Sequence, residues 1–215
     1  MMLLEDAHNL IRKTIRKSQG SYVSPEDIDL NLNRSLNDYV NFLLRPNGNT
    51  NNQPLTRYIS EQPYTSSSTN RFPLPDNFLK EINIYSSADG TTYEGDILKE
   101  QEFTDRKNSY ITSADTVHPI ARLLGTTETA LNGVIEILPS QGNFVLSYYR
   151  TIINCVYAYD SPDNRSIVFN EDDSVDIDCN SGVLSEIVSR ALTYFGISLE
   201  AQNLLSEEVV KNGNS

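Results

Sequence analysis

The sequence predicts an α+β fold made of an N-terminal helical hairpin, an antiparallel β-meander block and two C-terminal helices. Three observations support this prediction. Apolar residues recur at helical spacing near both ends of the chain. Short apolar runs separated by turn residues fill the centre. Capping residues stand where the helices are expected to begin and end.

The first 45 residues predict the helical hairpin, over residues 3–45. An apolar stripe at helical spacing predicts a helix over residues 3–17. Ser24 is a good N-cap and Pro25 suits a first helical position, so the second helix is expected to begin there. Its own apolar stripe runs from Ile28 to Leu43, and the turn between the helices is short enough to make them antiparallel.

Four basic residues gather at the C-terminal end of the first predicted helix: Arg12, Lys13, Arg16 and Lys17. Cations at this end of a helix complement its dipole. The alternative is that they form a basic contact for an acidic partner.

Residues 46–71 predict a long polar loop, because Asn, Ser, Thr, Gln and Pro dominate them. The apolar Leu55, Tyr58 and Ile59 interrupt this composition. The loop is expected to be mobile in a monomer, or to be an arm that orders against a neighbouring chain through these three residues.

Residues 72–178 predict a β-rich block. Strands are expected over residues 79–86, 91–98, 120–124, 133–138 and 144–153. A turn at 88–90 joins the first two strands, and a tight turn at 139–143 makes a hairpin of the last two. Residues 105–119 are polar and predict a loop. An antiparallel meander fits this series best.

The C-terminal part, residues 181–211, predicts a helix followed by an arm. Apolar residues from Leu184 to Phe195 recur at helical spacing, and Gly196 is a natural helix stop. Ser198 can cap a final helix that carries Leu199, Leu204, Leu205, Val209 and Val210. Residues 212–215 are expected to be a frayed tail, and residues 1–211 to form one domain.

The composition excludes several classes of protein. The formal net charge of −12 disfavours a DNA-wrapping groove, because acidic surfaces repel phosphate. Cys155 and Cys179 could form one disulfide, but buried free thiols are expected. No segment approaches membrane-spanning length, and the N-terminus lacks the basic residues of a signal peptide. A soluble protein made in a cytoplasm is therefore expected.

No residue pattern indicates an enzyme. His8 and His118 have no Cys or His partner at metal-ligand spacing, and no phosphate loop or nucleophile elbow is present. The best metal candidate is Asp176, Asp178 and Asn180, whose alternating oxygens could bind calcium. The alternative is a strand end followed by a helix cap. We expect no catalytic residue and no cofactor.

Several motifs follow one another in a specific order. Ser24-Pro-Glu-Asp27 begins a helix of the hairpin, and Phe-Pro-Leu-Pro-Asp-Asn-Phe-Leu (72–79) leads into a strand. Pro119 precedes a strand, and Ile-Glu-Ile-Leu-Pro (135–139) and Val-Leu-Ser-Tyr-Tyr-Arg (145–150) follow. This order, closed by a helix and an arm, resembles the head–tail connector proteins of tailed bacteriophages, of the adaptor or tail-tubular type. The resemblance covers most of the chain. The Asn-rich composition is also similar to ring proteins of crAss-like phages.

The resemblance implies a structural virion protein at the head–tail junction. It would form a twelvefold ring below the portal, contact other tail or neck proteins, and let DNA pass through without specific binding. The arm at residues 198–211 would dock on the portal or on an adjacent subunit. The alternative from another class is a β-rich module that binds a host surface or a polysaccharide, since Tyr and Asn side chains suit sugars.

Overall fold

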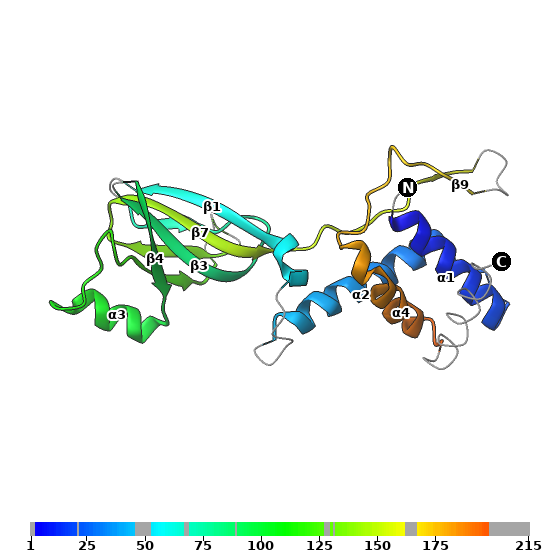
Figure 1. Cartoon of the computed structure of the whole chain (residues 1–215), viewed down its shortest axis with the longest axis horizontal. Helices are drawn as coiled ribbons and strands as arrows, with labels where there is room; N and C mark the ends of the chain where they lie inside the picture. Colours follow the sequence, from blue (N-terminus) through cyan, green and yellow to red (C-terminus); the bar gives the residue numbers. More distant parts are fainter. Residues whose placement is uncertain are drawn as a thin grey trace. The chain divides into compact units, whose positions relative to one another are not determined.

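The computed structural model describes residues 3–20, 22–45, 53–66, 69–88, 90–126, 130, 132–161 and 167–197. They divide into two compact units. The helical unit contains residues up to 57 together with those from 152 onward, and the sheet unit contains residues 58–151. The protein is α+β, with a pair of helices first, a seven-stranded sheet next and a helix near the end, which confirms the predicted class (Figure 1).

The helical unit begins with α1 (Leu3–Gln19) and α2 (Pro25–Leu43), as the sequence predicts. The backbone N–H of Asp27 donates to the Ser24 hydroxyl over 3.1 Å, which confirms Ser24 as the N-cap. Near the end of the described chain, a short 3-10 helix η2 (Ser181–Val183) runs into α4 (Leu184–Tyr194). Gly196 follows α4 with a φ of 77°, a left-handed conformation that suits glycine at a helix end.

One apolar core joins α1, α2 and α4 with the segment that returns from the sheet unit. It contains side chains from all three stripes, and Cys155 and Cys179 are buried in it as free thiols, as expected. Its fully buried members include Leu4, Ile11, Ile15, Ile28, Leu32, Leu36, Ile187 and Ala191.

Polar side chains of α2 bind the returning segment. Asn33 donates to the carbonyl of Cys155 over 3.0 Å and accepts from its N–H over 2.8 Å. Asp29 accepts from the N–H of Tyr157 over 2.8 Å. The chain then forms a short ribbon of β8 (Tyr159–Asp160) and β9 (Val168–Phe169), with a further bridge between Val156 and Val175. The predicted β-rich block therefore ends at residue 150, because residues 152–178 supply part of the helical core.

The described residues of the sheet unit form seven strands in the order β1-β7-β3-β4-β5-β6-β2. They are β1 (Ile59–Ser66), β2 (Arg71–Pro73), β3 (Phe78–Ala88), β4 (Thr91–Ile97), β5 (Ile120–Leu124), β6 (Val134–Leu138) and β7 (Gly142–Arg150). All neighbours are antiparallel except β4 and β5, which are parallel. Helix α3 (Glu100–Asn108) lies in the crossover between these two strands.

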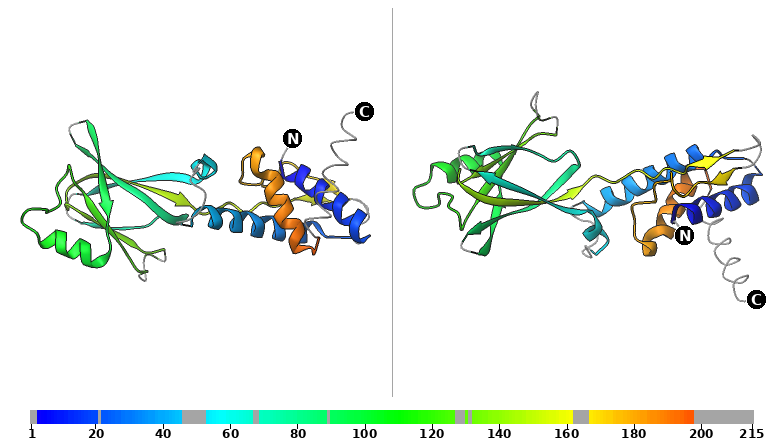
Figure 2. Two further views of the ribbon diagram at one scale, coloured as in Figure 1. Left: turned by 60° about the horizontal axis from the view of Figure 1, so that its bottom comes forward. Right: turned by 90° about the horizontal axis from the view of Figure 1, so that it is seen from above.

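The sheet curls, so that its two edge strands meet (Figure 2). The rings of Tyr64 in β1 and Phe72 in β2 lie 4.9 Å apart, and the Tyr64 hydroxyl donates to the carbonyl of Pro73 over 3.1 Å. The enclosed core contains Tyr64, Leu74, Ile84, Ala121, Ile135, Ile137, Phe144, Leu146 and Tyr148. Burial raises the pKa of Tyr64, which therefore stays a neutral donor.

The prediction of an antiparallel meander is wrong in two places. The strands β6 and β7 do not form a hairpin, because β6 pairs with β5 and β2 while β7 lies between β1 and β3. The chain also returns in parallel at β5, after α3 has carried it back along the sheet. Alternation of apolar residues identifies strands, but it does not identify their partners.

Part of the predicted polar loop at 46–71 is regular structure. Residues 53–58 form the 3-10 helix η1 (Gln53–Tyr58), and β1 pairs with β7 along all eight of its residues. Backbone hydrogen bonds to a central strand stabilise this edge strand, although most of its side chains are polar. Likewise α3 covers residues 105–108 of the predicted loop at 105–119.

Candidate interaction surfaces

Two of the three metal candidates, Asp176 and Asp178, accept hydrogen bonds from donors of the chain itself. Asp176 accepts hydrogen bonds from the N–H groups of Leu3 and Leu4, over 3.3 and 2.8 Å, and so caps the start of α1. Asp178 is buried and pairs with Arg57 over 2.9 Å. Asn180 is exposed at the start of η2. Among the described residues, no group of three or more potential metal ligands lies together.

The predicted contact residues divide into three groups. Leu55 and Tyr58 are buried within the chain, with 3% and 2% of their surface exposed. Ile59 is 41% exposed at the start of β1. The other five, Leu199, Leu204, Leu205, Val209 and Val210, lie outside the described residues.

His8 is fully buried in the helical unit, where its contacts hold the fold together. Its Nε2 lies 2.8 Å from the carboxylate of Asp29, and its ring stacks on Tyr157 with centroids 4.1 Å apart. Burial lowers the pKa of His8, and nearby Arg12 adds to this, although Asp29 acts in the opposite direction. The ring is therefore neutral, with its Nε2–H donating to Asp29, and its Nδ1 has no hydrogen-bond partner among the described residues.

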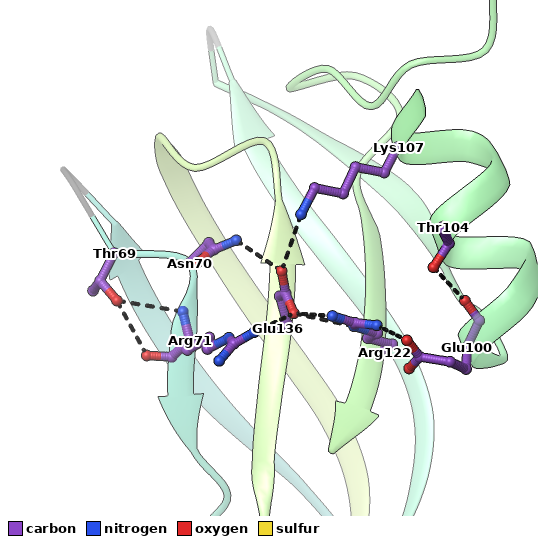
Figure 3. A network of polar contacts seen from close by, with 8 residues as sticks. All are labelled: Thr69, Asn70, Arg71, Glu100, Thr104, Lys107, Arg122 and Glu136. Carbon is purple, nitrogen blue, oxygen red and sulfur yellow. Dashed lines mark hydrogen bonds and ion pairs between the residues drawn. The ribbon is translucent and has the colours of Figure 1, made fainter. Parts of the chain in front are cut away.

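The buried carboxylate of Glu136 is the centre of a polar cluster in the sheet unit (Figure 3). Arg122 donates to it through Nε and Nη2, over 3.0 and 2.6 Å. Asn70 donates over 3.1 Å, and Arg71 and Lys107 lie 3.4 and 3.7 Å away. Burial alone would raise the pKa of Glu136, but Arg122, with Arg71 and Lys107, outweighs it and lowers this pKa.

This cluster fixes α3 on the outer face of β5 and β6. Lys107 and Glu100 come from α3, and Glu100 also pairs with Arg122. The Arg122 guanidinium lies 4.6 Å from the ring centre of Phe103, the fully buried residue of α3. Because every side of the carboxylate faces a donor, the cluster holds structure together and offers no general base. The signal in the sequence that could have identified this cluster is Glu136, a single acidic residue inside the apolar run of β6.

The first exposed apolar surface is the loop after α3, at residues 109–118. Tyr110 and Ile111 are 100% and 91% exposed. The loop is nevertheless held at both ends: the hydroxyl of Ser109 accepts from two N–H groups at its start, and Asp115 accepts from those of Val117 and His118. An adjacent pair of large apolar residues in a polar loop is the signal in the sequence for this feature.

The second exposed apolar surface is the outward face of the ribbon in the helical unit. Val156 and Val175, which oppose each other at a bridge, are 48% and 40% exposed. Val168, in β9, is 52% exposed. The neighbouring residues Cys155 and Tyr157 point into the core instead, as alternation along a strand requires.

A cleft of about 320 Å³ is the third feature, at the C-terminal end of α1. Its lining combines apolar side chains with two arginines: Arg12, Ile15, Arg16, Gly20, Tyr22 and Val23. It therefore gathers positive charge and apolar surface in an acidic protein.

None of the described helices has both the length and the apolar character needed to cross a membrane. Comparison with known proteins adds no identification. No protein-family model matches the sequence, and no curated protein is significantly similar to it.

Proposed function

We propose that this protein is a structural virion protein, whose copies form a ring at the head–tail junction of a tailed bacteriophage, below the portal. The order of the sequence motifs suggests this family of proteins. The observation that carries the proposal is that each of the two units exposes apolar side chains together, Tyr110 with Ile111 in one and Val156 with Val175 in the other. Grouped exposed apolar residues mark contacts between proteins more often than isolated ones do.

Two different apolar surfaces on one chain suit a ring. A contact in which one surface of a subunit meets another surface of the next is heterologous, and such contacts close into a ring when the rotation permits. Acidic walls suit a channel that DNA passes through, because they repel phosphate and prevent adhesion. This arrangement requires neither a cofactor nor catalysis.

The test is the assembly state of the full chain, alone and with the portal protein of the same genome. Analytical ultracentrifugation and negative-stain electron microscopy should show rings, or a complex of many copies on the portal. The double variants Tyr110→Ser/Ile111→Ser and Val156→Ser/Val175→Ser should assemble less well while keeping the circular dichroism of the wild type. Thr112→Ala, an exposed polar position of the same loop, is the matched control.

A chain that stays monomeric both alone and with the portal would overturn the proposal. Binding of the monomer to a glycan array would instead favour the host- or polysaccharide-binding module. Assembly that is unchanged in both double variants would show that these surfaces are not the contacts.

A further inference from the structure

Two arginines in the cleft at the C-terminal end of α1 lack acidic partners among the described residues. Arg12 and Arg16 line it, and neither forms an ion pair with a described residue. Arg12 lies 4.9 Å from the ring centre of Tyr157, and its buried Nη2 has no hydrogen-bond partner within the described part of the chain. A buried guanidinium donor without an acceptor is costly, so the cleft fits a ligand that brings a carboxylate.

The other residues that line the cleft indicate which class of acidic ligand fits it. Ile15 and Val23 give the cleft an apolar wall, and Tyr22 is 76% exposed at its edge. A small anion would leave these side chains against water. A segment with both apolar and acidic side chains would cover them and pair with the arginines.

Such a segment follows the last described residue, Ile197. Residues 198–215 combine the five apolar residues of the predicted arm with Glu200, Glu207 and Glu208. We propose that residues 199–210 dock in the cleft of their own chain, with the apolar side chains on Ile15, Tyr22 and Val23 and the glutamates beside Arg12 and Arg16. This inference concerns the single chain, and it holds or fails separately from the proposed ring.

The position and length of residues 198–215 favour the chain's own segment as the occupant of the cleft. Ile197 belongs to the same core as Ile15, which lines the cleft. Twelve extended residues span up to about 40 Å, so reach is not limiting. Tethering also gives the segment an effective concentration of about millimolar, far above that of a second copy in dilute solution.

Hydrogen exchange followed by mass spectrometry tests the proposal on the full chain. A free segment of this length forms at most a marginal helix and should exchange without protection. We expect protection over residues 199–210 in the wild type, at a level independent of protein concentration. Arg16→Glu should speed exchange there about two- to fivefold, which is the size expected of a partly exposed ion pair.

Lys13→Glu is the matched control, because it makes the same change of charge on α1 at an exposed residue outside the cleft. It should leave the protection intact. Combining Arg16→Glu with Glu207→Lys and Glu208→Lys should restore protection, because the cleft and the segment then carry opposite charges again. The melting temperature of each variant reports whether the helical unit is still folded.

Three results would overturn the proposal. The first is a wild-type segment that exchanges as fast as an unstructured peptide. The second is protection that Arg16→Glu leaves unchanged. The third is protection that disappears on dilution, since it would assign the cleft to the segment of another copy.

Discussion

At the scale of single residues, Glu136 shows how much one buried charge can stabilise. Replacing it by Gln keeps its size but removes the charge that faces Arg122, whose side chain is only 12% exposed. We expect Glu136→Gln to lower the free energy of unfolding by about 2–4 kcal/mol, because a mostly buried guanidinium loses its counter-charge. Urea unfolding measures the change.

Glu100→Gln is the control for this prediction. Glu100 also pairs with Arg122, but its side chain is 70% exposed. Removing an exposed ion pair should change the free energy of unfolding by no more than about 1 kcal/mol. Equal effects of the two substitutions would show that the burial of Glu136 contributes nothing.

His8 predicts how the stability depends on pH. Because the folded chain lowers its pKa, the unfolded chain binds the proton first as the pH falls through about 6.5. The contribution of His8 to the free energy of unfolding is therefore fully present above this pH. Below it, the free energy of unfolding should decrease by at most about 1.4 kcal/mol per pH unit. Urea unfolding between pH 7.5 and 5.5 measures this slope.

The only other histidine provides the control for this slope. His118 is exposed, with 76% of its side chain accessible. His118→Gln should retain the wild-type slope, while His8→Gln should flatten it over the same range. A slope that survives in His8→Gln would assign the effect to another group.

Residue roles could be predicted from the sequence where the signal is local. Ser24 was identifiable as an N-cap because capping needs only its position before Pro25 and two acidic residues. The partners of Glu136 could not be predicted, since Arg71, Lys107 and Arg122 come from three separate elements. The oxygens of Asp176 and Asp178 suggested calcium, but only the folded chain brings backbone N–H groups and Arg57 to them.

At the scale of elements, the parallel step from β4 to β5 depends on one glycine. A Cβ at Gly95 would lie 2.4 Å from the carbonyl oxygen of Pro119 and 2.6 Å from its ring. The same carbonyl accepts the N–H of Asp96 over 3.1 Å, so the backbone cannot move away without losing that bond. Gly95→Ala should therefore cost about 1–3 kcal/mol of stability.

Gly125→Ala provides a matched control within the same unit, because a Cβ there meets nothing within 4 Å. Its effect on stability should stay within about 0.5 kcal/mol. Urea unfolding compares the two variants, and hydrogen exchange at Asp96 and Leu98 reports the strand pairing. Gly95→Ala with wild-type stability would mean that β4 and the Pro119 loop are not closely packed.

The extents of the elements were predictable, and their pairing was not. The strands at 120–124 and 134–138 match the prediction within a residue, because alternating apolar side chains are a local property. Strand β1 was missed because its stability comes from pairing with β7, which is distant in the sequence. Helix α3 was missed because it has a single buried residue, Phe103, and hence no apolar stripe.

At the scale of the whole molecule, the described residues form two cores in two compact units, whereas the sequence predicts one domain. The sequence predicts apolar helical stripes at both ends of the chain, but it does not indicate that these stripes pack into one core. The sequence could not indicate that residues 152–178 join this core, because they contain only short apolar pieces in an acidic setting.

The division of the helical unit into two stretches of sequence has a consequence for synthesis. Helices α1 and α2 leave the ribosome first, but α4 and the segment that completes their core follow only after the whole sheet unit. At about 5–20 residues per second, this delay is on the order of ten seconds. During that time the apolar faces of α1 and α2 stay uncovered, so a nascent chain stalled before residue 152 should be a preferred client of chaperones.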